Sequence, residues 1–270
     1  MSGTTEGQTD QTAQQAPSMF ERSLVVPMFR NVRLPGLLGT YLAGLTISDE
    51  EIWRKIRAEE MLAEARWRTF LHPRQMYPQY FDPDLLATMN TANYPVMEEP
   101  GYDYEPEMFQ GDSWGDIQLR RTHVVTIQRI QFCYPNPQQQ LYVIPADWIR
   151  YDRKYGRVNL VATTTPTAIP LNVFIMGALS GGRRIPLMMQ VVYQAGLQNA
   201  FRDEPDIVDY ILKCAALSFI EDQFVPQSGS VSIDGMSQSS SFQIGQLRDQ
   251  LDRRADIIER RLNGIRVGFC

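Results

Sequence analysis

The sequence contains only two histidines and three cysteines, which limits the chemistry that it can support. Catalytic triads and histidine-based metal sites have only His72 and His123 to draw on. Cys133, Cys214 and Cys270 are an odd number without close spacing, so we expect neither a disulfide framework nor a zinc site. The motifs Gly-x-Ser-x-Gly and His-Glu-x-x-His are also absent. We therefore predict a protein that is not an enzyme and that uses no cofactor and no metal.

Long apolar runs and a secretion leader are missing as well. The first 18 residues contain no Lys or Arg and no apolar core, which predicts no signal peptide. No run approaches the roughly 18 apolar residues of a membrane-spanning helix. We expect a soluble chain with no membrane partner, and a reducing cytosol fits its cysteines. The net charge of −5 argues against a protein that coats DNA by neutralising phosphates.

Lysine is scarce, because only Lys55, Lys154 and Lys213 occur among the 26 basic residues. The planar guanidinium group of arginine suits ion pairs across subunit contacts. A codon bias of the genome explains the same preference equally well. Both interpretations stay open at this point.

The last quarter of the sequence predicts a helix, a loop and a second helix. Asp203 and Glu204 precede Pro205, which suits a first helical turn, so a helix should begin there. Its apolar residues lie on all sides, which predicts burial among several neighbours. Residues 225–242 hold seven serines and two glycines, which predicts a long loop. From Gln243 apolar residues recur every three or four positions, close to a heptad seam, over roughly 30 Å of helix.

The N-terminal region begins with a polar tail and an arm. Residues 1–17 are rich in Thr and Gln and too poor in apolar side chains to repay the entropy of ordering. Between Phe20 and Leu45 apolar residues alternate with Pro and Gly. This mixture predicts an extended arm with turns, which could lie on a neighbour.

Two helices follow the arm. Ser48 and Glu51 form a capping box that opens a helix reaching about Phe70. Asp82 and Pro83 start a short helix through Met89.

From Ile117 to Ala195 the apolar pattern shifts towards a period of two, which predicts strands. Residues 169–176 and 185–193 alternate clearly, and GALSGGRR (177–184) between them favours a hairpin turn over a phosphate loop. A change of parity after Ile127 predicts a β-bulge. We expect about five strands in a small antiparallel sheet.

These elements predict an α+β fold, with a helical core formed by the N- and C-terminal parts and an inserted small antiparallel β-domain. The expected units, in chain order, are a disordered polar tail (1–18), an arm with helices (19–97), the inserted β-domain (98–196) and the C-terminal helix, loop and helix (197–270).

An acidic segment without any basic residue runs from Glu98 to Asp116 and holds Glu98, Glu99, Asp103, Glu105, Glu107, Asp112 and Asp116. A solvated loop is the simplest interpretation. A calcium loop would need glycine and bidentate glutamate positions that are missing. A third interpretation is a negative surface that faces sliding DNA, because like charge prevents sticking. Glu105 and Glu107 are the channel-facing candidates.

One basic patch carries aromatic residues between its charges, from Arg150 to Arg157. This composition is used to contact nucleic-acid backbones. Asp147 and Asp152 dilute the positive charge. A hairpin tip that touches water or a neighbouring protein is the simpler interpretation.

Three motifs carry a resemblance to a known family. VVYQAGL (191–197) leads into the acid-capped helix, and GSVSIDGMSQSSSF (229–242) leads into the last helix. LPGLLGTYLAGLTISDEEIWRKIRAEEMLAEARWRTFLHPRQMYP (34–78) has a Leu-Thr helix entry and a terminal Pro-Arg. In these motifs the chain resembles the head–tail adaptor, or connector, proteins of tailed bacteriophages. The likeness covers the two ends of the chain, while the β-insert and the polar tail depart from shorter family members.

The resemblance implies a structural virion protein that is assembled in the host cytoplasm. It would form a homo-oligomeric ring, commonly of twelve copies, beneath the portal protein. The ring would extend the DNA channel without sequence-specific binding and would dock the next neck or tail protein. Another neck or tail component, such as a tail terminator or a tube protein, is the alternative. A metal-dependent hydrolase that uses the acidic segment is a remote one.

Contact residues are predicted at the C-terminal end. Apolar residues after the last charged helix have no obvious core of their own, so the portal-contact candidates are Ile265, Val267 and Phe269, with Ser230 and Ser232 in the serine-rich loop as the second choice. Charged residues on the last helix could pair between subunits and set their register. The subunit-interface candidates are Arg248, Asp252, Arg254 and Glu259.

Overall fold

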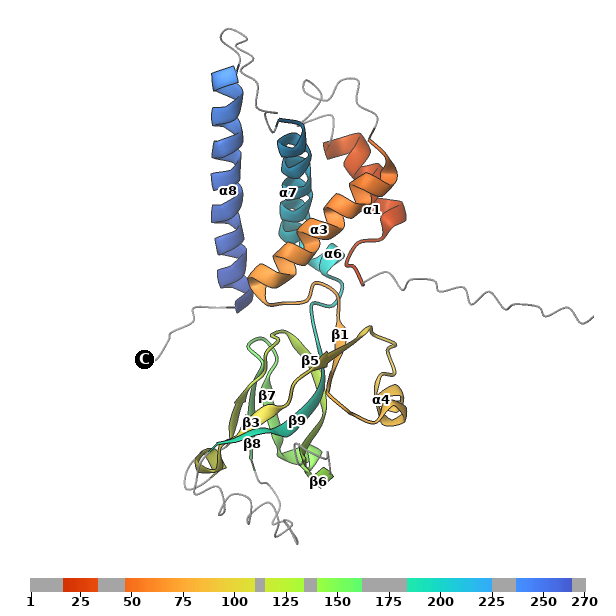
Figure 1. Cartoon of the computed structure of the whole chain (residues 1–270), viewed down its shortest axis with the longest axis vertical. Helices are drawn as coiled ribbons and strands as arrows, with labels where there is room; N and C mark the ends of the chain where they lie inside the picture. Colours follow the sequence, from red (N-terminus) through yellow and green to blue (C-terminus); the bar gives the residue numbers. More distant parts are fainter. Residues whose placement is uncertain are drawn as a thin grey trace, which may run out of the picture.

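The structure is a computed structural model that describes residues 17–33, 47–109, 115–133, 140–161, 184–224 and 237–263. Most helices gather at one end of the molecule and the strands at the other (Figure 1). We call these parts the helical body and the sheet body, and we call residues 68–73 and 196–199, which join them, the waist. The chain therefore has an α+β fold, as predicted.

Helix α7 (Pro205–Phe224) is the central element of the helical body. It packs against α3 (Asp49–Trp67), α8 (Ser237–Asn263) and the π-helix η1 (Phe29–Arg33), and α1 (Arg22–Met28) completes this body (Figure 1). Its apolar side chains join one core with residues from all these neighbours. The predicted start at Pro205 and the predicted burial on several sides are both confirmed.

The capping box predicted for α3 is present. The hydroxyl oxygen of Ser48 accepts a hydrogen bond from the backbone N–H of Glu51 at 3.2 Å. The helix ends at Trp67 because Arg68 adopts the left-handed conformation, with φ of 53°. Its buried face includes Ile52 and Ile56, which are four residues apart and so lie on the same side of the helix.

The prediction of an extended arm from Phe20 to Leu45 is wrong for the described part. Residues 22–33 form α1 and the π-helix η1, with Pro27 inside the helix. Val25 and Phe29 are fully buried, and the ring of Phe29 lies 6.0 Å from that of Phe219 on α7. This burial against α7 offsets the weak local preference for helix. Residues 34–45 lie outside the described residues.

Helix α8 begins six residues earlier than predicted, at Ser237 instead of Gln243. Extending a helix by one residue costs far less than nucleating one, so the established helix can propagate into a serine-rich stretch. The predicted loop therefore ends before Ser237, and its residues 225–236 lie outside the described residues.

The described strands of the sheet body form two sheets. The larger has the order β2-β1-β9-β5-β6, with β3 also paired to β9, and comprises β1 (Arg74–Pro78), β2 (Val96–Glu99), β3 (Tyr102–Tyr104), β5 (Val124–Cys133), β6 (Gln140–Val143) and β9 (Ile185–Ala195). The smaller, of order β4-β8-β7, comprises β4 (Asp116–Gln118), β7 (Ile149–Asp152) and β8 (Arg157–Leu160). Among the described strands, every pair is antiparallel except β1 with β2.

Several details of the sheet body extend or confirm the predictions. The described strands outnumber the expected five, and β1 and β2 begin before residue 98, where the inserted domain was expected to start. The register of β5 on β9 shifts between Val124 and Thr126 and again between Ile127 and Arg129, which confirms a β-bulge near Ile127. The predicted strand 169–176 and nearly all of the following turn lie outside the described residues.

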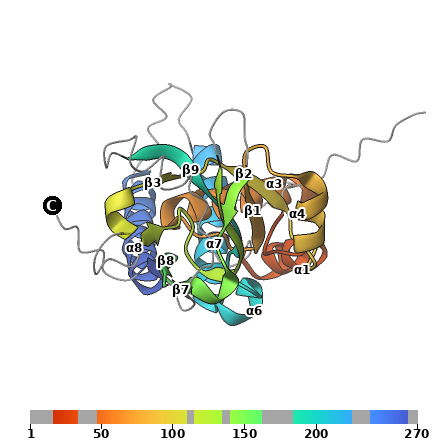
Figure 2. The ribbon, with the colours of Figure 1, turned by 90° about the horizontal axis from the view of Figure 1, so that it is seen from below.

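Short helices complete the fold. In α4 (Pro83–Met89) the side chain of Asp82 accepts a hydrogen bond from the backbone N–H of Asp84 at 2.9 Å, as the Asp-Pro start predicted. The others are α6 (Ala200–Asp203) and the 3-10 helices η2 (Pro106–Phe109) and η3 (Ala146–Trp148). Seen from below, the strands lie in front of the helical body (Figure 2). The waist joins the two cores, because Leu71 belongs to the helical core and Phe70 to the sheet core.

Candidate functional site

The last residue of α8, Asn263, is held by hydrogen bonds to residues next to the waist. Its Nδ2 donates to the carbonyl oxygen of Trp67 at 2.8 Å, and its Oδ1 accepts from the hydroxyl of Thr122 at 3.4 Å. The hydroxyl oxygens of Thr122 and Thr69 are 2.8 Å apart. Asn263 is 6% exposed and Thr69 is fully buried. Helix α8 therefore has a fixed end, from which residues 264–270 continue.

The predicted portal-contact residues lie outside the described residues. These are Ile265, Val267 and Phe269, which follow Asn263, and Ser230 and Ser232, which fall between α7 and α8. Their roles stay predictions. What the structure adds is the starting point of the C-terminal segment, beside Thr122 at the junction of the two bodies.

Three of the four subunit-interface candidates on α8 form ion pairs inside the chain. The pairs are Arg248 with Glu221 at 2.6 Å, Arg254 with Asp209 at 2.6 Å, and Asp252 with Arg66 at 3.0 Å. The fourth candidate, Glu259, is half-buried on the same helix. Partly exposed pairs contribute about 0.2–1 kcal/mol each, so these pairs set the register of α8 on α7 and α3 more than they stabilise it. A further contact with a second copy stays a prediction.

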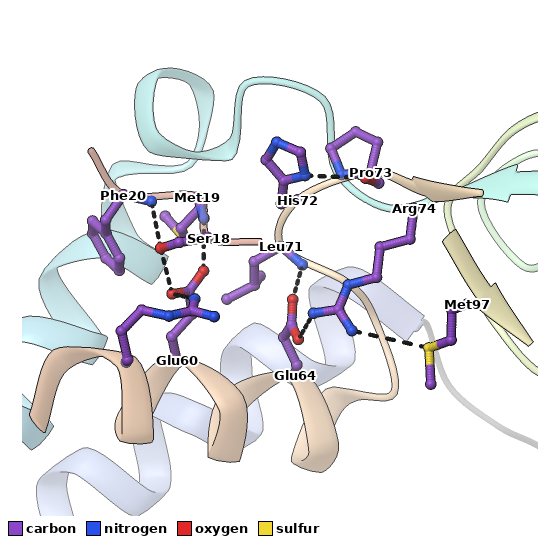
Figure 3. A network of polar contacts seen from close by, with 11 residues as sticks. Ser18, Met19, Phe20, Glu60, Glu64, Leu71, His72, Pro73, Arg74 and Met97 are labelled. Atoms are coloured by element: carbon purple, nitrogen blue, oxygen red, sulfur yellow. Dashed lines mark hydrogen bonds and ion pairs between the residues drawn. The ribbon is translucent and has the colours of Figure 1, made fainter. Parts of the chain in front are cut away.

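A buried carboxylate on α3 fastens the segment that precedes α1 (Figure 3). Glu60 is fully buried and accepts hydrogen bonds from the hydroxyl of Ser18 and the backbone N–H of Met19, both at 2.7 Å. It also pairs with Arg57. An unpaired buried carboxylate would be costly, and these three partners offset that cost.

One turn further along α3, Glu64 joins this helix to β1 across the waist (Figure 3). It accepts hydrogen bonds from the backbone N–H of Leu71 at 2.9 Å and from Nη2 of Arg74 at 2.6 Å. Burial raises the pKa of Glu64, and the charge of Arg74 opposes that rise. The guanidinium group of Arg74 also lies over the ring of Phe70, 4.2 Å from its centre. This network ties the helical body to the sheet body.

Neither of these two carboxylates was predicted from the sequence as a buried contact. Both lie on the apolar face of the predicted helix, four and eight residues after the buried Ile56. An acidic residue on a buried face needs buried partners. That placement was the available signal, although it could not name Ser18 or Arg74 as the partners.

The acidic segment contains a buried carboxylate, Glu99, at the end of β2. Glu99 is 6% exposed and accepts hydrogen bonds from the hydroxyls of Tyr102 at 2.7 Å and Tyr193 at 3.0 Å. Burial raises the pKa of Glu99, while the two hydroxyls and Arg120 favour its charged form. The group links β2, β3 and β9, so this part of the segment is not a solvated loop.

Two further carboxylates of the segment are paired with arginines. Asp103 pairs with Arg184 and accepts a 2.8 Å hydrogen bond from the backbone N–H of Leu187. Burial works to raise the pKa of Asp103, but the Leu187 N–H and Arg184 outweigh it and lower the pKa. Asp116 forms a two-pronged pair with Arg157, with a shortest distance of 2.5 Å.

The channel-facing candidates lie where the segment reaches the surface. Glu105 follows β3, and its Oε1 is 3.9 Å from Nε of Arg184. Glu107 lies in η2 and is exposed. That they face DNA stays a prediction.

Neither histidine belongs to a group of residues that could hold a metal ion in the described part of the chain. Within the described ranges, no group of three or more His, Cys, Asp or Glu residues is arranged to hold a metal ion. Nδ1 of His72 is 3.0 Å from the carbonyl oxygen of Pro73. His123 directly precedes β5, and burial, Lys154 and Arg261 lower its pKa to about 4. The hydrolase alternative therefore finds no metal cluster in this part of the chain.

The basic patch forms the hairpin of β7 and β8. A side-chain oxygen of Asp152 accepts hydrogen bonds from the backbone N–H groups of Lys154 at 2.8 Å and Tyr155 at 3.1 Å, and Gly156 follows with φ of 68°. The predicted hairpin is confirmed, while a contact with DNA stays a prediction.

Among the helices of the described part, none has both the length and the apolar content that crossing a bilayer requires.

Comparison with known proteins gives distant likenesses. The sequence matches no protein-family model and no curated protein. Among solved structures, the chain is similar to one in the neck of an empty gene transfer agent (GTA) particle computed with C6 symmetry, at 14% identity and a TM-score of 0.44, over 94% of this chain and 95% of that one. A chain in the virion of a native GTA particle is similar at 16% identity and a TM-score of 0.43, over 91% of each chain. Likenesses at this level carry no argument about what this chain does.

Proposed function

We propose that this chain is a structural protein of a phage-like virion, a head–tail adaptor that forms a ring beneath the portal. The observation that carries the proposal is the fixed end of α8. Asn263 anchors the helix beside the waist, so residues 264–270 start from a defined point. The resemblance in the motifs at 191–197 and 229–242 supplies the family.

The proposed assembly uses different surfaces for different partners. Residues 264–270, with Ile265, Val267 and Phe269, contact the portal, and the serine-rich loop with Ser230 and Ser232 is the second contact. The acidic side chains of Glu105 and Glu107 face the DNA channel. Twelve copies form the ring, and its lower face docks the next neck or tail protein.

The experiment is a mass measurement on the purified chain, alone and after mixing with the portal protein of the same particle. We expect the chain to join the portal ring in a fixed stoichiometry. A chain truncated after Asn263 should fold normally, because Asn263 and its partners are retained, but should no longer bind the portal. A truncated chain that still binds would overturn the role of residues 264–270.

A second candidate is another neck or tail component, such as a tail terminator or a tube protein. It would share the α+β fold and the waist without requiring a portal. A small oligomer of this chain that ignores the portal but joins tail proteins would favour it over the adaptor.

A further inference from the structure

Helix α3 carries an exposed apolar stripe. Four of its small or apolar residues are exposed at the spacing of one helical face: Ala58, Met61, Leu62 and Ala65. Met61 is 57% exposed and Leu62 is 62% exposed. Such positions on a surface helix are normally polar, and contiguous exposed apolar side chains mark an interaction site. We call these four residues the α3 stripe.

An uncharged, leucine-rich segment lies next to the start of the same helix in sequence. Residues 34–46 contain five leucines and one tyrosine and no charged residue. A segment of this composition gains free energy by covering apolar surface. The α3 stripe offers apolar surface, and Asp49 and Glu50 at the start of α3 are already paired with arginines.

Arg30 holds the two ends of this segment together. Its Nη2 donates to the carbonyl oxygen of Ile47 at 2.7 Å, and its Nε donates to Oδ1 of Asp49 at 3.2 Å. Arg30 lies in η1, which ends at Arg33, so the segment leaves and returns at nearly the same place. The described residues on either side of the segment therefore meet at the N-terminal end of α3.

Chain length decides whether the loop can cover the stripe of its own molecule. At about 3.4 Å per residue, a loop of this length that goes out and back reaches at most about 24 Å. Along α3 the rise of about 1.5 Å per residue places Met61 roughly 18 Å and Ala65 roughly 24 Å from Asp49. The segment can therefore reach Met61 of its own chain, but it can cover Ala65 as well only when it is fully extended. A second copy can bring its whole stripe to the segment without that extension.

We propose that residues 34–46 of one copy cover the α3 stripe of a second copy. The contact is heterologous, because one copy supplies the loop and the other the stripe, and repeated contacts of this kind close into a ring or continue as a filament. The inference rests on the proposed ring only in requiring neighbouring copies. It names the surfaces that join them.

The test uses the full chain and sedimentation over a range of concentrations. The double variant Met61→Glu, Leu62→Glu should weaken self-association at least tenfold and leave the fold intact, because both side chains are exposed. Leu37→Ser with Leu38→Ser should weaken it by a similar factor. Combining both pairs should add little, since the two surfaces act in one contact. The control is Ile257→Glu on α8, a side chain that is 65% exposed and lies outside the stripe.

Mixing the two variants distinguishes a contact between copies from a contact within one chain. Equal amounts of the stripe variant and the loop variant should form heterodimers, because the intact loop of the first meets the intact stripe of the second. No recovery on mixing, an equal effect of Ile257→Glu, or a wild-type chain that stays monomeric up to about 1 mM would each overturn the proposal. Portal binding is measured separately, so a failure of the adaptor role and a failure of this contact remain distinguishable.

Discussion

Oε2 of Glu99 accepts a 3.0 Å hydrogen bond from the hydroxyl of Tyr193, a residue 94 positions away in the sequence. Oε1 of the same carboxylate accepts from Tyr102 at 2.7 Å. Tyr193 is fully buried and lies in β9, the strand that pairs with β1, β3 and β5. The carboxylate at the end of the edge strand β2 is therefore bound to the central strand β9 of the larger sheet, and its burial disfavours the charged form.

This burial predicts a pH dependence of stability. The folded pKa of Glu99 is raised, so the folded state binds its proton more tightly than the unfolded state, whose pKa is about 4.3. The stabilisation from this proton is fully present below the unfolded pKa and is lost as pH rises through the folded pKa. The free energy of unfolding of wild type, minus that of Glu99→Gln, should fall over this window and then level off.

Urea denaturation at a series of pH values measures this difference. The control is Glu98→Gln, because Glu98 is the neighbouring residue in β2 and is exposed. Its difference from wild type should not follow the same curve. A Glu99→Gln difference that stayed constant over this pH range would contradict the prediction.

The hydrogen bonds of Asn263 predict a loss of stability on truncation. Asn263→Ala leaves the carbonyl oxygen of Trp67 without this donor in a buried place, which costs about 1–3 kcal/mol. Urea denaturation should show this loss, and hydrogen exchange should rise in the last turns of α8. Gln250→Ala, at an exposed position of α8, should change stability by less than about 0.5 kcal/mol. Equal effects of the two variants would mean that Asn263 does not anchor the helix.

We expect substitution by alanine to have opposite effects on stability at two glycines. A Cβ on Gly101 would lie 2.7 Å from the carbonyl oxygen of Leu187 and 3.1 Å from that of Met189, so Gly101→Ala should destabilise by about 1–3 kcal/mol. A Cβ on Gly245 in α8 would meet nothing within 4 Å, so Gly245→Ala should stabilise by about 0.5–1 kcal/mol. Thermal denaturation of both variants checks the signs. A neutral Gly101→Ala would show that β3 can move away from β9.

The starts of α3, α4 and α7 were predictable because the residues that signal a helix start lie within one turn of it. Ser48 with Glu51, Asp82 with Pro83, and Pro205 lie within one turn of the helices that they open, and all three starts are confirmed. The prediction of an extended arm was wrong because a contact distant in sequence, and not a local signal, decides the structure there. Its prolines and glycines argue against helix locally, while the burial of Phe29 against a helix far along the chain decides in favour.

The candidate site was less predictable than the fold. Charges on α8 were correctly placed on a helix, but the partners of Arg248, Asp252 and Arg254 lie in α7 and α3 of the same chain. Nothing in the local pattern distinguishes a partner within the chain from a partner in a second copy. The same holds for Glu60 and Glu64, whose position on an apolar face was visible while their partners were not.

By itself the sequence determined the fold class, the starts of α3, α4 and α7, the bulge in β5 and the central, buried character of α7. Periodicity and caps record these features in residues a few positions apart. Only the tertiary structure decided which buried carboxylate meets which donor, where α8 is anchored, and that β1 and β2 join the larger sheet. Those contacts join residues far apart in the chain, and their free energy depends on desolvation and geometry that exist only once the chain has folded.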